Sequence, residues 1–313
     1  MKQTAATCLG AGVMGLPAGE ALAAGRRRWR VACRDVHLKA TGKPDCWTAA
    51  QALGVDGLEV AVNEELVCTS LFHPDRKYGL ATAAGVARLR ADLRAHGLAV
   101  TAFCMSNRLD ERLELEVAWM QKLVVAAKSL RVPAIRIDVV PRVVARDQFL
   151  PFAVRACQRL VEQVAGTSIR LGIENHGTTT NDPAFLEPLF KSVGSAQLGL
   201  TLDACNLYWF GHPLRDLYGI CERFAGRVVH THCKNIRYPE DQRNQRRAIG
   251  WEYERYACPV NEGDIDYRRV ADILRRTHYR GDLCLENECL GHYPKEQHAG
   301  LLAQEVAFLR SVA

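Results

Sequence analysis

The chain has 313 residues, of which 48% are hydrophobic and 24% are charged, with 24 glycines and 12 prolines. This composition excludes collagen-like, coiled-coil and mainly disordered chains, and the length allows one large α/β domain or two smaller ones. The 41 basic and 35 acidic residues leave a formal net charge of +6, which is too small to indicate nucleic-acid binding. The 12 cysteines are too few for a small disulfide scaffold, and no apolar stretch reaches the roughly 20 residues that span a bilayer.

Residues 1–24 differ in composition from the rest of the chain. They contain one lysine and one glutamate among mostly Ala, Gly, Thr and Leu, and they end in ALAA, which is typical of a leader cleavage site. We predict a secretory leader over residues 1–24, similar to the tail of a twin-arginine leader without its arginines, and export to the periplasm. If the leader is not functional, we expect a cytoplasmic location.

The same segment has a competing interpretation. Residues 10–15 (GAGVMG) match the glycine pattern of a dinucleotide-binding loop, and Asp35 lies 20 residues beyond the last glycine. The preceding residues 4–8 (TAATC) are too few and too poor in Val and Ile for a buried parallel strand, and Pro17 falls early in the expected helix. We therefore favour the leader over a nicotinamide or flavin site.

From residue 28 onward, short apolar runs alternate with helical stretches. Eight runs have the character of buried strands: 29–33, 57–60, 99–103, 134–138, 169–174, 198–203, 228–232 and 283–286. The stretches between them are amphipathic, as in 86–96, 113–130, 152–165 and 266–277. This alternation predicts a single (β/α)8 TIM barrel over residues 25–313, with an eight-stranded doubly wound sheet as the alternative.

One connection, residues 236–263 between the seventh and eighth predicted strands, is longer than the others and shows no regular pattern. It is rich in residues that suit a polar ligand: Arg237, Arg243, Arg246, Arg247, Tyr238, Trp251, Tyr253 and Tyr256. Connections of this length are often lids or binding loops. We expect a lid over the ligand, and the alternative is a surface decoration or a subunit contact in a homo-oligomer.

The last four predicted strands each end in a potential metal ligand. These residues are Glu174, Asp203, His232 and Glu286. The spacing fits βα units of about 30 residues, with the insertion in the last gap, so the four side chains are expected at one mouth of the barrel. A single acid would indicate a helix cap, but four in register predict a metal site. Three carboxylates and one imidazole suit Mn²⁺, Mg²⁺ or Co²⁺, with Zn²⁺ as a further candidate.

Several motifs surround these residues: GIENHG at 172–177, LDACN at 202–206, HTHCKN at 230–235, GDIDY at 263–267 and GDLCLE at 281–286. Together they resemble the sugar phosphate isomerase/epimerase family of xylose isomerase-like barrels, over most of the chain from residue 53 onward. The resemblance implies that Glu174, Asp203, His232 and Glu286 bind one divalent cation. It also implies that Glu174 and Glu286 move protons, as in the ketose 3-epimerase branch, and that the substrate is a sugar or a sugar derivative.

The chemistry of sugar isomerisation also calls for a cation and two carboxylates, without reference to the resemblance. Isomerising a hydroxy ketone requires removal of a proton from the carbon beside the carbonyl; a cation stabilises the enediolate, and two carboxylates serve as base and acid. We therefore predict a metal-dependent isomerase or epimerase. The alternatives are a lyase, dehydratase or keto-glycoside-cleaving enzyme that uses the same enolisation, and a noncatalytic sugar-binding barrel.

Five further residues are candidates for substrate contacts: His176, Asn206, His230, Lys234 and Arg237. The epimerase branch carries Arg six residues past the metal-binding His, where this chain has Tyr238, so a ketohexose epimerase is in doubt. Glu59 and Asp138 end the second and fourth predicted strands and either line the pocket or cap helices. DNA-repair endonucleases of the superfamily bind three zinc ions with many histidines; residues 233–277 contain none, so abasic-site cleavage is not expected.

Overall fold

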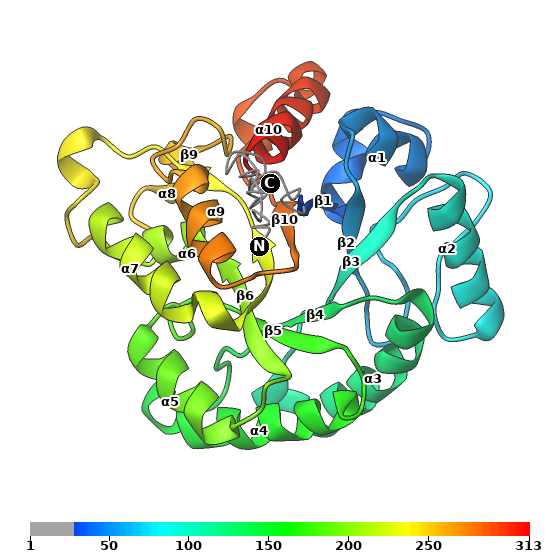
Figure 1. The fold of residues 1–313 in the computed structure, drawn as a ribbon, viewed down its shortest axis with the longest axis horizontal. Helices are drawn as coiled ribbons and strands as arrows, with labels where there is room; N and C mark the ends of the chain where they lie inside the picture. The colour runs from blue at the N-terminus through cyan, green and yellow to red at the C-terminus, as the bar shows by residue number, and fades with distance from the viewer. Residues whose placement is uncertain (1–27) are drawn as a thin grey trace, which may run out of the picture.

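The computed structural model describes residues 28–313, and these residues form a nearly closed barrel of parallel strands (Figure 1). The strands neighbour one another in chain order: β1 (Arg30–Arg34), β2 (Gly57–Ala61), β3 (Ala99–Cys104), β4 (Ala134–Ile137), β5 (Arg170–Glu174), β6 (Leu198–Asp203), β7 (Val228–His232) and β10 (Asp282–Leu285). The predicted TIM barrel is confirmed. The predicted leader at 1–24 and the glycine motif at 10–15 lie outside the described residues.

The ring closes through two contacts of the last strand. β10 pairs with β1 in parallel, from Arg30 opposite Asp282 to Cys33 opposite Leu285. On its other side, the Cys233 N–H donates to the Cys284 carbonyl at 2.8 Å, just past the end of β7. Since the barrel strands run in one direction, their carboxyl ends meet at one mouth.

Helices surround the barrel on the outside (Figure 1). The longer ones are α1 (Cys46–Leu53), α2 (Ala83–Ala95), α3 (Leu109–Leu130), α4 (Phe149–Val164), α5 (Pro183–Val193), α7 (Leu214–Phe224), α9 (Tyr267–Arg276) and α10 (His298–Val312). Each buries an apolar face; in α4 this face includes Ala153, Cys157, Leu160 and Val164, which recur at helical spacing. Within residues 28–313, no helix combines the length and apolar character needed to cross a membrane.

The segment 236–263 is more ordered than its sequence indicates. β8 (Asn235–Ile236) pairs antiparallel with β9 (Ala257–Cys258), and the short helix α8 (Tyr253–Tyr256) precedes β9. Tyr238 and Arg247 are buried, and the Arg247 guanidinium lies 4.4 Å from the Tyr238 ring. The expectation that Tyr238 and Arg247 face a ligand is therefore wrong: these two side chains anchor the segment to the protein.

A buried carboxyl joins this segment to the last helix. Glu305 of α10 accepts hydrogen bonds from the Val260 N–H at 2.8 Å and from Asn287 Nδ2 at 2.7 Å. Asn287 directly follows Glu286, so Glu305 connects the end of the insertion with the loop that leaves β10. Burial raises the pKa of Glu305 to about 7, because its two hydrogen bonds offset only part of the desolvation.

This raised pKa predicts a pH-dependent stability. A carboxyl with a higher pKa in the folded state binds more protons when folded, so its contribution is present at low pH and is lost as the pH rises from 4.5 to 7. The shift corresponds to roughly 3 kcal/mol. Relative to the wild type, Glu305→Gln should therefore become more stable between pH 5 and pH 8, as measured by urea unfolding at both pH values. The exposed Glu296→Gln should show no such difference, and a Glu305→Gln difference that does not change with pH would contradict the assignment.

Candidate metal centre

Four side chains from different strands meet at the mouth of the barrel. Glu174, Asp203 and His232 are the last residues of β5, β6 and β7, and Glu286 directly follows β10. All four are buried, and each offers one ligand atom within 4.8 Å of the ligand atoms of the others. The structure thus brings together the four residues that the sequence singles out as metal ligands.

Local hydrogen bonds fix the orientation of Asp203. Its Oδ1 accepts the Asn206 N–H at 2.8 Å, so the side chain caps the short helix α6 (Ala204–Trp209). Asn175 then ties β5 to β6, since its Oδ1 accepts the Asp203 N–H at 2.8 Å and its Nδ2 donates to the Asp203 carbonyl at 2.7 Å. With Oδ1 engaged, Oδ2 is the Asp203 atom left for a ligand.

The electrostatic environment differs among the three carboxylates. Burial alone would raise the pKa of Glu286, but Lys234, His232 and Arg34 together hold that pKa well below its ordinary range. Asp203 has less compensation, because Lys234 is its main cationic neighbour while Glu286 and Glu174 repel its charge. Burial therefore raises the pKa of Asp203 to about 7. Glu286 is ionised at neutral pH, whereas Asp203 is only partly ionised there, and a further positive charge would favour its ionised form.

The donor atoms fit a divalent cation. Asp203 Oδ2 and His232 Nδ1 are buried and make no hydrogen bond within residues 28–313, and the charged neighbour of Asp203 Oδ2 is Lys234 Nζ at 3.2 Å. His232 Nδ1 lies 3.2 Å from Glu174 Oε1 and 3.3 Å from Glu286 Oε2, so it faces the carboxylates. A buried polar atom without a hydrogen bond is costly, and a cation at this point would coordinate His232 Nδ1 and add to the positive charge that Lys234 offers Asp203 Oδ2. Carboxylate oxygens with one imidazole are a ligand set for Mn²⁺, Mg²⁺ or Co²⁺.

Two arginines that sequence reasoning missed compensate the glutamates. Arg136 of β4 donates from Nε to Glu174 Oε2 at 2.6 Å and from a terminal nitrogen to Asp138 Oδ2 at 2.8 Å. Arg34, at the end of β1, pairs with Glu286 and lies 3.0 Å from Glu59 Oε1. A signal was present in the sequence: Arg136 interrupts an apolar strand, and a buried arginine needs a carboxylate partner.

A chain of buried polar groups lies behind His232. Its Nε2 is 2.6 Å from Glu59 Oε2, which is also 2.5 Å from His230 Nε2, and His230 Nδ1 is 2.7 Å from Asp282 Oδ1. Partners of this kind fix the ring orientation of a metal-binding histidine. Glu59, His230 and Cys284 form a second group of potential ligands. Burial raises the pKa of the Cys284 thiol well above its usual range, which leaves it a poor ligand.

The predicted substrate-binding residues fall at different distances from the cluster. Asn206 Nδ2 donates to Glu174 Oε1 at 3.0 Å, and Lys234 Nζ lies 2.9 Å from Glu286 Oε2 and 3.2 Å from Asp203 Oδ2. His230 is buried in the layer beneath, in contact with Glu59. The cluster therefore includes Asn206 and Lys234 among its direct neighbours.

The two remaining candidates are exposed. His176 follows β5, and its Nδ1 lies 3.3 Å from Asp138 Oδ1, so it reaches the site through Asp138 and Arg136. The Arg237 side chain is exposed and makes no hydrogen bond or ion pair to residues of the described chain. His176 is thus placed at the rim of the mouth, and Arg237 is not brought into the cluster.

Eight parallel strands with a buried carboxylate–histidine cluster at their carboxyl ends define a TIM barrel with a candidate divalent-metal centre. Residues 47–312 match the xylose isomerase-like TIM barrel family, and the chain belongs to that family. The resemblance that the sequence motifs indicate is thereby confirmed.

Curated relatives, including the following two, match part of the chain. The rhizopine catabolism protein MocC of Rhizobium meliloti is 26% identical over 133 residues, which are 41% of this chain and 40% of the relative. An inosose dehydratase of Histophilus somni is 23% identical over 133 residues, which are 41% of this chain and 44% of the relative. The chain therefore matches less than half the length of these relatives.

Solved structures share the fold at low sequence identity. The IOLI protein with a bound zinc atom has a TM-score of 0.66 at 13% identity, covering 90% of this chain and 98% of that one. A Mycobacterium smegmatis xylose isomerase-like barrel in complex with magnesium has a TM-score of 0.66 at 17% identity, covering 91% and 96%. The 3-keto-D-glucoside 4-epimerase of E. coli has a TM-score of 0.62 at 13% identity, covering 91% and 100%.

The cluster predicts how metal content responds to mutation. Asp203→Ala removes one ligand and should reduce the bound divalent cation from about one per chain to a small fraction, measured by elemental analysis after dialysis. Asp138→Asn, a buried carboxylate change beside the cluster, should leave the metal content unchanged. Equal metal in Asp203→Ala and the wild type would place the cation elsewhere.

Proposed function

We propose that this protein is a divalent-metal-dependent enzyme that isomerises or epimerises a small sugar or sugar derivative by proton transfer at the carbon next to a carbonyl. The observation that carries the proposal is the pair of buried glutamates, Glu174 and Glu286, within one group of ligands. The fold shared with a 3-keto-D-glucoside 4-epimerase supports it. Export through the predicted leader favours unphosphorylated sugars or keto-glycosides, since phosphorylated sugars are mostly intracellular.

The two glutamates divide the proton transfers. A divalent cation, when bound, supplies Lewis-acid polarisation of a carbonyl oxygen. Burial would raise the pKa of Glu174, but Arg136 and His232 lower it below its ordinary range, as Lys234 and His232 do for Glu286. Both carboxylates are therefore ionised before reaction and able to accept a proton. Because they extend from β5 and from the end of β10, one can take the proton from the substrate carbon. The other can return a proton from another direction once it has itself taken one up from solvent.

The neighbouring polar groups hold these carboxylates in place. Asn206 and Arg136 each engage one oxygen of Glu174, and Arg34 and Lys234 each engage one oxygen of Glu286. Fixed orientation lowers the entropic cost of reaching the transition state. Lys234 Nζ also has donor capacity for a substrate hydroxyl or for a developing enediolate oxygen, since an ammonium carries three N–H groups.

Glu286→Gln tests the proton-transfer role. The amide keeps a coordinating oxygen but cannot accept a proton, so turnover should fall by about 100-fold or more while metal content falls far less. The measurement is NMR of deuterium incorporation from D₂O into a panel of ketoses and keto-glycosides, with wild type, Glu286→Gln and Asp138→Asn compared. Normal exchange in Glu286→Gln would assign the acid–base role to another residue.

A dehydratase is the second candidate, and the match to inosose dehydratase favours it. The same proton abstraction would be followed by loss of a β-hydroxyl as water. The two reactions differ in their products. An isomerase returns a sugar of the same composition, heavier only by the deuterium taken from solvent, whereas a dehydratase releases an unsaturated ketone lighter by one water. Mass spectrometry of the same reaction mixtures separates them.

The segment 236–263 reaches the candidate site through one tyrosine. The Tyr253 hydroxyl donates to Glu288, whose Oε1 lies 2.9 Å from Lys234 Nζ. Lys234 in turn contacts Glu286 and Asp203, so the segment is connected to the ligand cluster by three hydrogen-bonded side chains. We propose that this connection holds the segment over a bound substrate, where it excludes water from the reacting carbon.

Tyr253→Phe should therefore impair turnover without affecting the metal. Loss of one charge-assisted hydrogen bond is expected to lower kcat/KM by about tenfold, while metal content and thermal stability remain near those of the wild type. Tyr256→Phe is the matched control, because the Tyr256 hydroxyl makes no hydrogen bond within the described residues and its ring packs on Trp251. If both variants behave alike in steady-state kinetics, the segment does not act through Tyr253.

A further inference from the structure

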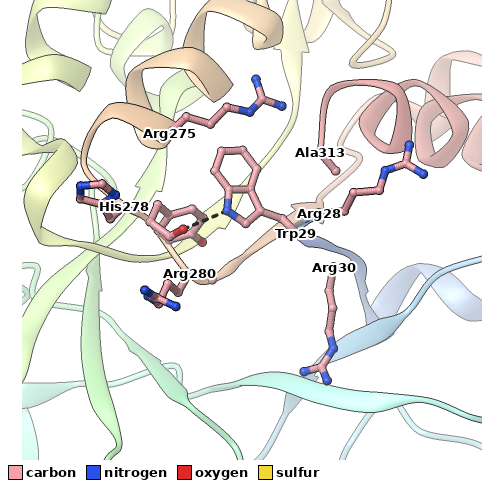
Figure 2. Close-up of a pocket in the computed structure, with 9 residues that line it drawn as sticks. Arg28, Trp29, Arg30, Arg275, His278, Arg280 and Ala313 are labelled. Carbon is pink, nitrogen blue, oxygen red and sulfur yellow. Dashed lines mark hydrogen bonds between the residues drawn. The ribbon is translucent and has the colours of Figure 1, made fainter. Parts of the chain in front are cut away.

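A cavity of about 720 Å³, drawn in Figure 2, lies at the amino-terminal ends of β1 and β10, and the ligand cluster lies at the carboxyl ends of the strands. Its walls come from the chain entering β1, the end of α9 and the turn into β10, and they include Arg28, Trp29, Arg30, Arg275, Tyr279 and Arg280. Since β1 begins at Arg30 and β10 begins at Asp282, the cavity belongs to the amino-terminal ends of the strands. This volume suits a small ligand.

The walls of this cavity are strongly basic. Among residues 28–313, four arginines and one histidine line it, and none of the lining side chains in that range is a carboxylate. Arg30, His278 and Arg280 are exposed and make no side-chain hydrogen bond or ion pair within residues 28–313. Arg276, one residue beyond Arg275 on α9, instead pairs with Glu222 at 2.9 Å. Uncompensated like charges repel one another, and an anion in the cavity would relieve that repulsion.

The buried side chains of Trp29 and Tyr279 contact each other in the wall of the cavity, and the arginines lie around them. Trp29 Nε1 donates to the Tyr279 carbonyl at 2.9 Å, and the two rings meet edge to face at 5.4 Å. The Arg275 guanidinium lies 5.1 Å from the Trp29 ring and is held by Asp272 Oδ1 at 2.8 Å. Figure 2 shows the side chains of Arg28, Arg30, Arg275 and Arg280 extending in different directions around the Trp29 indole.

We propose that this cavity binds a small anion that carries at least two phosphate or carboxylate groups. Guanidinium groups recognise both groups through paired N–H donors, and several arginines around one space favour a ligand with several charges. A nucleic acid would need exposed aromatic faces for stacking, but Trp29 and Tyr279 are only 9% and 8% exposed. Of the lining residues that the structure describes, none is an exposed large apolar side chain of the kind that inserts into a membrane.

Calorimetric titration with pyrophosphate tests the proposal. The full chain should bind one pyrophosphate, while acetate, with a single charge, should bind far more weakly. The double variant Arg30→Gln/Arg280→Gln should weaken the pyrophosphate affinity by about tenfold or more, since each substitution removes a charged donor. Arg276→Gln is the matched control and should leave the affinity unchanged. Asp203→Ala should also bind normally, because pyrophosphate held by a metal at the other mouth would be lost in that variant.

Three results would overturn the proposal. The first is no binding of pyrophosphate at millimolar concentration, and the second is binding that Arg30→Gln/Arg280→Gln does not weaken. The third is binding of phosphatidylserine vesicles or a single-stranded oligonucleotide that exceeds pyrophosphate binding and is lost in the same double variant, which would assign the arginines to a macromolecular surface. Circular dichroism of each variant confirms folding, which exposed arginine changes should preserve.

Discussion

Mutual repulsion among three buried carboxylates is the constraint around which the mouth of this barrel is organised. Glu174, Asp203 and Glu286 lie within one cluster, where water cannot screen them. Arg136 compensates the first and Arg34 and Lys234 the last, which leaves Asp203 with its pKa raised to about 7. The arginines and the lysine contact the carboxylates from around the cluster, and the atoms that face one another inside it suit a cation.

The barrel fold holds these carboxylates and their cationic partners in fixed positions. Parallel strands bring their carboxyl ends to one mouth, and the side chains just inside that mouth link neighbouring strands. Glu59 of β2 joins Arg34 of β1 to His232 of β7, while Asn175 joins β5 to β6. The ligands are therefore held by hydrogen bonds between strands rather than by mobile loops, as a site that orients a substrate carbon requires.

Patterns that are local in the sequence predicted the fold and the ligand cluster. Apolar runs that end in a polar residue located the strands and, at the ends of the last four, Glu174, Asp203, His232 and Glu286. The position of His230 follows from strand alternation: it lies two residues before His232 on the same face, one layer deeper in the barrel. The burial of Arg247 against Tyr208 was not predictable, because it depends on packing between segments about 40 residues apart.

X-ray absorption spectroscopy of the cobalt- or manganese-loaded protein identifies the atoms that hold the cation. If Glu174, Asp203, His232 and Glu286 hold the cation, the first shell will contain one imidazole nitrogen and otherwise oxygen, at about 2.0–2.2 Å. Eleven free cysteines lie within residues 28–313, and one of them, Cys284, belongs to the competing group with Glu59 and His230. A sulfur scatterer near 2.3 Å, or a shell without imidazole, would contradict the account.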